Sequence, residues 1–122
     1  LTEAIDRAAK FKELGADILF VEAPKSVDEM RTLCAELPGP KMANMVEQGD
    51  TPYLLEDELG EMGYKIAIYP VSMMLASIKA MEGVLANLKS GKNPEGQITF
   101  PELRDIVGFP EYYEAEKKYA AD

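Results

Sequence analysis

The feature that most constrains the fold is a repeated unit, in which an apolar run ends in a polar or turn-forming residue and a helix-like stretch follows. Three such runs occur, at 18–24, 41–47 and 64–70. Their marker residues Glu22, Asn44 and Tyr69 are 22 and 25 positions apart, the length of one strand–loop–helix unit. Consecutive units build a parallel sheet, and polar side chains at strand exits are typical of the active-site rim of an α/β barrel. The pattern predicts part of a barrel enzyme.

Chain length predicts which part of a barrel is present. The 122 residues are about half of a barrel of roughly 250 residues, and Leu1 falls inside a helical pattern. Either the N-terminus was processed or the chain is a fragment, and we expect a fragment. We interpret it as the C-terminal half of one α/β-barrel domain, with barrel units over 1–90 and a helical tail over 91–122.

Composition excludes several classes of function. The net charge of −9 argues against nucleic acid or an anionic membrane as a partner. No apolar run approaches the roughly 18 residues needed to cross a bilayer. Cys34 is the only cysteine, which fits a reducing, cytoplasmic location. The chain has no histidine, so within these residues a Ser-His triad, a His-ligated zinc and a His general base are excluded.

Local signals predict where the helices and strands begin and end. We expect helices over 2–14, 26–37, 52–62, 71–90, 100–108 and 110–119, and strands over 17–21, 42–46 and 65–69. Gly15 and Gly63 stand where a left-handed residue ends a helix. Ser26 with Glu29, and Thr99 with Glu102, are predicted capping boxes. Thr51 is predicted to cap the third helix, with Pro52 at its first position.

The predicted helix 71–90 is apolar on two sides. One apolar stripe contains Met74, Ile78, Met81, Leu85 and Leu88. A second stripe beside it contains Met73, Ala76, Ala80 and Val84. A helix that is apolar on more than one face must be buried against more than one neighbour. The second neighbour could be another subunit.

Four short motifs, in order along the chain, resemble the isocitrate lyase/phosphoenolpyruvate mutase superfamily. They are Val-Glu-Ala-Pro at 21–24, Ala-Asn-Met-Val-Glu-x-Gly-x-Thr-Pro at 43–52, Gly-Tyr-Lys at 63–65 and Ile-Tyr-Pro-x-Ser at 68–72. Each motif alone is weak, but the ordered set is specific and covers essentially the whole chain.

This resemblance implies a (β/α)8 barrel whose eighth helix is swapped onto a neighbouring subunit, a role that helix 71–90 fits. It implies a homotetramer and a bound Mg²⁺ that holds an α-oxyacid substrate and stabilises an enolate-like intermediate. The metal ligands, an arginine and the loop with the catalytic cysteine are expected upstream of Leu1, so no metal ligand is expected in this chain. Cys34 does not match the loop cysteine.

Two positions distinguish branches of the superfamily. Methylisocitrate lyases carry one arginine where this chain has Leu75 and a second near the position of Phe100. Such cations would pair with the extra carboxylate of a tricarboxylate. Both positions are apolar here. The tail 100–119 resembles the branch of 2,3-dimethylmalate lyase, oxaloacetate-cleaving enzymes and carboxyvinyl-carboxyphosphonate phosphorylmutases. A small dicarboxylate or phosphonate substrate follows from that similarity.

Three polar residues at strand exits are the candidate site residues. Glu22 ends a strand buried on both sides, where a carboxylate is costly unless paired. It is either a cap or loop ion pair, or the catalytic carboxylate that the resemblance implies. Asn44 is a poor strand former, and it either satisfies a neighbouring loop or donates to a substrate carboxylate. Glu47 could pair with a lysine or reach another side chain of the site, and is predicted to be substrate-binding.

Other rim residues have simpler predicted roles. Thr51 is expected to cap a helix, Tyr69 and Pro70 to shape the end of the last strand, and Ser72 to cap the following helix.

The leading functional hypothesis is a Mg²⁺-dependent lyase that cleaves a C–C bond of a 2-oxo- or 2-hydroxy-dicarboxylate. The enzymatic alternative is carboxyvinyl-carboxyphosphonate phosphorylmutase, which performs P–C bond chemistry. A third alternative is a non-catalytic half-barrel with an assembly role, because three strands cannot close a barrel.

Overall fold

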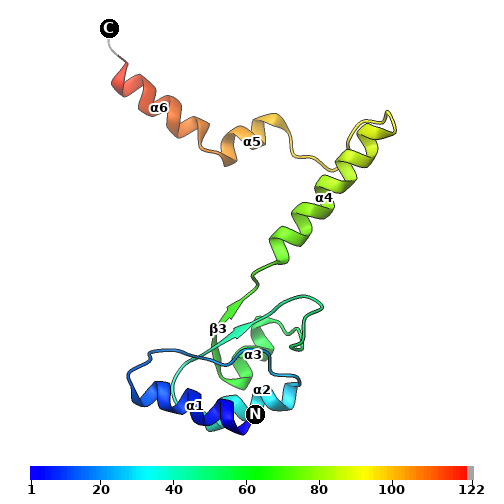
Figure 1. Ribbon diagram of the computed structural model, residues 1–122. Coiled ribbons are helices and arrows are strands. Elements are labelled where there is room, and N and C mark those ends of the chain that lie inside the picture. The colour runs from blue at the N-terminus through cyan, green and yellow to red at the C-terminus, as the bar shows by residue number, and fades with distance from the viewer. Residues whose placement is uncertain (121–122) are drawn as a thin grey trace. The chain divides into compact units, whose positions relative to one another are not determined.

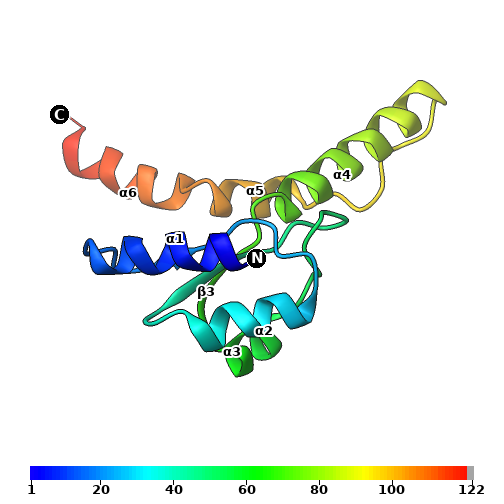
Figure 2. The same cartoon turned by 60° about the horizontal axis from the view of Figure 1, so that its bottom comes forward.

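A three-stranded parallel sheet in the order β1-β2-β3 organises the first part of the chain. The computed structural model describes residues 1–120. These fall into two compact units, one over Leu1–Ile78 and one that begins at Lys79. The elements of the first unit alternate regularly (Figures 1 and 2): α1 (Thr2–Glu13), β1 (Leu19–Phe20), α2 (Val27–Glu36), β2 (Lys41–Asn44), α3 (Glu56–Met62) and β3 (Tyr64–Ile68). The predicted strand–helix units are confirmed.

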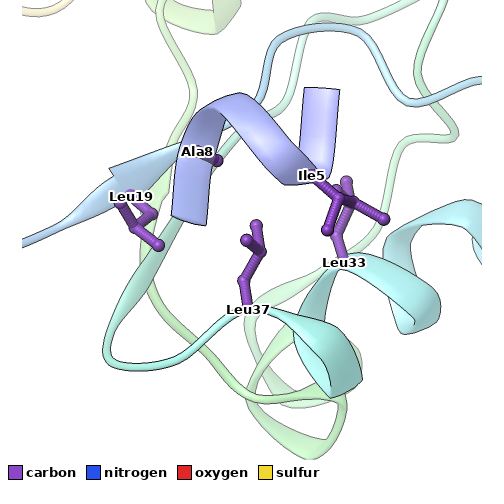
Figure 3. Packing of buried hydrophobic residues seen from close by; sticks show 5 residues of the cluster. All are labelled: Ile5, Ala8, Leu19, Leu33 and Leu37. Atoms are coloured by element: carbon purple, nitrogen blue, oxygen red, sulfur yellow. The ribbon is translucent and has the colours of Figure 1, made fainter. Parts of the chain in front are cut away.

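Two apolar clusters hold the helices to the sheet. In the first, Ile5 and Ala8 of α1 pack with Leu19 and with Leu33 and Leu37 at the end of α2, and Figure 3 shows these side chains turned toward one another. The second cluster joins α2 and α3 to β2 and β3 through Met30, Ala43, Met45, Leu59 and Tyr64. The helices thus cover one face of the sheet.

The opposite face of the sheet carries a second row of apolar side chains. Phe20 pairs in register with Met42, and Met42 with Ile66. Phe20 and Ile66 are 42% and 38% exposed, so this face has little cover among the described residues. An irregularity in the pairing between Lys41 and Met42 turns Tyr64 to the helix side while Ile66 stays on the other face.

Lys41 is the buried charged residue of the core, at 8% exposure. Its ammonium group donates to the carbonyl oxygens of Cys34 at 3.2 Å and Leu37 at 3.0 Å. These carbonyls belong to the last turn of α2, where helix geometry leaves acceptors without partners. Lys41 therefore closes the end of α2 and joins it to the start of β2.

The second unit contains α5 (Phe100–Ile106) and α6 (Phe109–Tyr119), while α4 (Ser72–Lys89) begins in the first unit and ends in the second. Thr99 and Glu102 form the predicted capping box. The guanidinium of Arg104 lies 5.5 Å from the ring centroid of Phe109 and donates to the hydroxyl of Tyr113. These contacts join α5 to α6.

Several boundary predictions are confirmed and two caps are wrong. Ser72 does not cap α4, because it is the first residue of that helix and its hydroxyl donates to Glu47. Gly63 ends α3 with a φ of 109°, as expected, and the Ser26 side chain accepts from the Glu29 amide. The reciprocal bond of that box goes elsewhere, because Glu29 accepts from the amide of Lys25.

The cap predicted at Thr51 is the other one that is wrong, since α3 begins at Glu56. The Leu54 amide donates to the sulfur of Met45, and the hydroxyl of Tyr69 donates to the Leu54 carbonyl at 3.2 Å. These bonds hold residues 51–55 out of a helix. Leu55, the residue before α3, is 61% exposed.

Helix α4 forms over nearly the predicted range, but none of its residues is buried against the rest of the described chain. Both of its apolar sides are exposed there, including Met73 at 82% and Leu85 at 66%. Across residues 1–120, no helix combines the length and the apolar character that crossing a membrane requires.

Candidate functional site at the strand exits

The pairing of the strands brings the predicted site residues to the same end of the sheet. Asn44 is the last residue of β2 and pairs with Ile68, the last residue of β3. Glu22 follows Phe20 by two positions, as Asn44 follows Met42, and Phe20 and Met42 are partners. The carboxyl ends of parallel strands are where barrel enzymes place their catalytic groups.

Asn44 lies on the face of the sheet that the helices leave open. Its neighbours Ala43 and Met45 are buried on the helix side, so alternation places the Asn44 side chain on the other face, where it is half-buried. A small cavity of about 10 Å³ is lined in part by Ala23, Asn44 and Thr51. This volume is close to that of one water-sized sphere, so it is too small for a substrate.

Glu22 is exposed and is followed by a strained residue. The helix α2 is capped by Ser26, so Glu22 is not its cap, and within residues 1–120 Glu22 makes no ion pair. Ala23 has a φ of +56°. A non-glycine residue in this conformation costs about 1–3 kcal/mol and persists only where its surroundings enforce it, which is common at functional sites.

Glu47 lies in a tight turn after β2. The Gly49 amide donates to the Val46 carbonyl at 3.1 Å, and Gln48 has a φ of +60°. A Cβ at position 49 would lie 3.1 Å from the Val46 oxygen, so glycine suits the closest approach of this turn. Oε1 of Glu47 accepts a hydrogen bond from the Ser72 hydroxyl. The lysine partner considered for Glu47 is absent among the described residues, and Ser72 takes that place.

Two further contacts tie the rim loops together. The Lys25 ammonium, after β1, bonds to Asp50, after β2, and this hydrogen bond lowers the pKa of the Asp50 carboxyl below its usual value. The ring of Tyr69 lies 5.7 Å from that of Tyr53, centroid to centroid. Burial raises the pKa of the Tyr69 hydroxyl. Tyr69 thus anchors the 51–55 segment at the end of β3, in keeping with the shaping role predicted for it.

Several rim features carry no sequence signal or only a weak one. Nothing in the sequence marks Ala23 and Gln48 as left-handed, because glycine and asparagine are the usual residues there. The opposite charges of Lys25 and Asp50, each just after a strand, could have suggested their pairing.

The described part of the chain was expected to lack metal ligands, and this bears on the proposed Mg²⁺. Within residues 1–120, no three His, Cys, Asp or Glu side chains are grouped so that they could hold a metal ion. Glu22 is the exposed carboxylate at the exit of β1. The described residues therefore do not form a complete Mg²⁺ site.

Parallel strand–helix units with polar side chains gathered at the carboxyl ends of the strands are typical of α/β enzymes, the α/β barrels among them. Comparison with known proteins makes this more specific. Residues 1–89 match the phosphoenolpyruvate phosphomutase family, and the chain belongs to that family.

The similar curated proteins are longer than this chain. It is 39% identical to 2,3-dimethylmalate lyase of Eubacterium barkeri over 98% of the chain and 43% of that protein. It is 40% identical to 2-methylisocitrate lyase of Aeropyrum pernix over 90% of the chain and 37% of that protein. The chain thus spans less than half the length of these relatives.

Solved structures agree on the fold. A crystal structure of 2,3-dimethylmalate lyase, a PEP mutase/isocitrate lyase superfamily member, matches with a TM-score of 0.89 at 28% identity, over 99% of this chain and 41% of the other. Oxaloacetate acetylhydrolase bound to 3,3-difluorooxalacetate matches with a TM-score of 0.91 at 24% identity, over 100% and 42%. The predicted fold class and superfamily are confirmed.

Proposed function

We propose that the protein containing these residues is a Mg²⁺-dependent lyase that cleaves a C–C bond of a 2-oxo- or 2-hydroxy-dicarboxylate and leaves an enolate-like intermediate. The observation that carries this proposal is the ordered set of polar strand exits, Glu22 and Asn44 above all, in a chain 39% identical to 2,3-dimethylmalate lyase. Mg²⁺ would act as a Lewis acid, and we expect its ligands on other parts of the protein.

The chain's own residues have distinct proposed tasks. The amide group of Asn44 donates a hydrogen bond to a substrate carboxylate, and its place on the open face of the sheet supports this. The Glu22 carboxylate lies at the neighbouring strand exit, where it would act as the catalytic carboxylate near the metal and the substrate oxygens. Ala23, the next residue, has a strained left-handed backbone of the kind that is common at functional sites.

The preference for a dicarboxylate depends on two apolar positions. Relatives of similar identity include 2-methylisocitrate lyases, so overall similarity alone does not separate the branches. Leu75 stands where, and Phe100 near where, the resemblance predicts arginines for a tricarboxylate. Without those cations, a third carboxylate would be buried unpaired, which is costly.

A direct assay tests this function. Purified protein with Mg²⁺ is expected to convert 2,3-dimethylmalate to pyruvate and propionate, or oxaloacetate and water to oxalate and acetate, as followed by proton NMR. Asn44→Ala should raise KM, and Asn44→Asp should raise it more because two carboxylates then repel. If the protein consumed neither 2,3-dimethylmalate nor oxaloacetate nor any other 2-alkylmalate, the proposal would be refuted. The intact mass of the native polypeptide should be measured first, since 13.5 kDa would mean that the upstream ligands are absent.

A second candidate function is supported by one relative. The chain is 35% identical to the chloroplastic carboxyvinyl-carboxyphosphonate phosphorylmutase of Arabidopsis thaliana, over 98% of this chain and 37% of that protein. Phosphorus NMR of the products would distinguish P–C bond formation from C–C cleavage. A non-catalytic half-barrel, the third alternative, would form a stable oligomer with no Mg²⁺-dependent activity.

We also propose that the protein is a cytoplasmic homo-oligomer, a tetramer, assembled through α4. The support is the exposure of both apolar sides of that helix and a sequence with one cysteine. Analytical ultracentrifugation of the protein with Leu85→Glu should show dissociation if α4 is the interface.

A further inference from the structure

The strained turn at 46–49 follows the candidate substrate-binding residue Asn44, and a side-chain hydrogen bond joins this turn to α4. Asn44, the last residue of β2, comes two positions before the turn. The turn itself contains Glu47 and the left-handed Gln48. A left-handed non-glycine residue is retained only where other contacts fix the backbone around it. The Gly49 amide bond to Val46 and the Lys25 bond to Asp50 contribute to this, and the bond from Ser72 to Glu47 is the contact that joins the turn to α4.

The bond between Glu47 and Ser72 extends the pairing of β2 and β3 beyond the sheet. The last backbone bond between these strands runs from the Met45 amide to the Ile68 carbonyl, at 2.8 Å. Beyond it, residues 46–49 turn away and the chain after β3 passes into α4. Ser72 is the first residue of α4 and lies 25 positions after Glu47. The side-chain bond therefore holds the exit of β2 to the start of α4.

The surroundings of the Glu47 carboxylate favour a fixed position. Oε1 is occupied by Ser72, and Oε2 is buried with no hydrogen-bond partner within the described residues. The carboxylate also lies at the N-terminal end of α4, where the helix dipole favours a negative group. A side chain held in this way is poorly placed to swing toward a substrate.

We propose that Glu47 is a positioning residue: through its bond to Ser72 it fixes the turn 46–49 and so sets the orientation of Asn44. This inference deepens the proposed function and rests on it. It assigns Glu47 an indirect task, in place of a direct contact with substrate. Ser72 is the second member of the pair, and its loss should have the same effect.

Three substitutions in the intact protein separate the indirect role from a direct one. Glu47→Gln keeps an oxygen that accepts from the Ser72 hydroxyl, so it should retain activity within about threefold of wild type. Glu47→Ala and Ser72→Ala should each raise KM about three- to tenfold, the effect of one lost hydrogen bond, with a smaller change in kcat. The double variant should lose no more than either single one, because both remove the same bond.

A direct contact with substrate predicts a different set of results. Glu47→Gln would then be as damaging as Glu47→Ala, Ser72→Ala would be close to wild type, and their effects would multiply in the double variant. Any of these outcomes overturns the proposal. The matched control is Ser77→Ala, which removes a hydroxyl of the same helix that bonds only to the Met73 carbonyl. It should leave KM unchanged.

A second measurement needs no substrate and keeps the proposal testable if the lyase assay fails. Amide hydrogen exchange at residues 46–49 should be at least about tenfold faster in Ser72→Ala than in Ser77→Ala, because the turn loses its tether. Equal exchange in the two variants would overturn the tether itself. If the wild-type protein had no lyase activity but the two variants showed the expected difference in exchange, only the proposed function would be refuted.

Discussion

Replacement of Lys41 by methionine tests whether a buried ammonium group stabilises the fold or merely tolerates burial. Met keeps an unbranched apolar stem of similar length, so the packing changes little, but the donor to the Cys34 and Leu37 carbonyls is lost. An acceptor left unpaired on burial costs about 1–3 kcal/mol. Removal of a buried charge returns part of that cost.

We expect Lys41→Met to lower the free energy of unfolding by about 1–3 kcal/mol, because two carbonyls lose their donor and the relief of charge burial offsets part of that loss. Urea unfolding followed by circular dichroism measures it. The matched control is Lys65→Met, which changes an exposed lysine of the neighbouring strand β3 and should alter stability by no more than about 0.5 kcal/mol. If the two variants were equally stable, the ammonium would not be closing the end of α2.

Four further predictions concern the core, the half-buried thiol of Cys34, the dependence of stability on pH, and a helix cap. Met30→Ala, at a fully buried position, should cost about 2–5 kcal/mol of unfolding free energy, whereas exposed Leu55→Ala should change it by less than about 1 kcal/mol in the same urea titration. Burial raises the pKa of the Cys34 thiol, partly offset by Lys41, so iodoacetamide should label it slowly near neutral pH and still more slowly in Lys41→Met; rapid labelling of the folded protein at pH 7 would contradict this. Burial also raises the pKa of the Tyr64 hydroxyl. Because Cys34 and Tyr64 both have raised pKa values in the folded state, the stability they contribute should be fully present below the ordinary thiol pKa and should be lost as the pH rises above that value. The thermal midpoint should therefore fall in that range of pH. Thr99→Ala should remove the first bond of the capping box and cost about 1 kcal/mol locally, read as faster amide exchange in α5 while α3 is unchanged.

Features set by neighbouring residues were predictable from the sequence. Gly63 and the Thr99 capping box depend on contacts within four positions, and both formed as expected. The order of strands and helices followed from the spacing of apolar runs, because each run needs a covered sheet to be buried. The cap at Thr51 failed because distant contacts decided it: Leu54 is held by Met45 and by Tyr69.

The sequence predicted which residues lie at the strand exits, but it did not predict the contacts between them. The strand exits placed Glu22, Asn44 and Glu47 on one rim, yet no pattern indicated that Glu47 would bond to Ser72. That bond joins residues 25 positions apart through a turn whose left-handed residue is an unmarked glutamine. The roles of these residues stay predictions for the experiments above.

The even spacing of the paired strands also has a consequence for how the chain folds. Leu19 pairs with Lys41 and Met42 pairs with Ile66, so each pairing closes a segment of nearly the same length. The free-energy cost of loop-closure entropy differs between these two segments by only about 0.1 kcal/mol. Proximity therefore favours neither pairing, and the order of assembly depends on which helix docks first. The cluster that α2 and α3 share with β2 and β3 includes the fully buried Met30, Met45 and Leu59, so we expect the β2–β3 half to form early and β1 to join it afterwards.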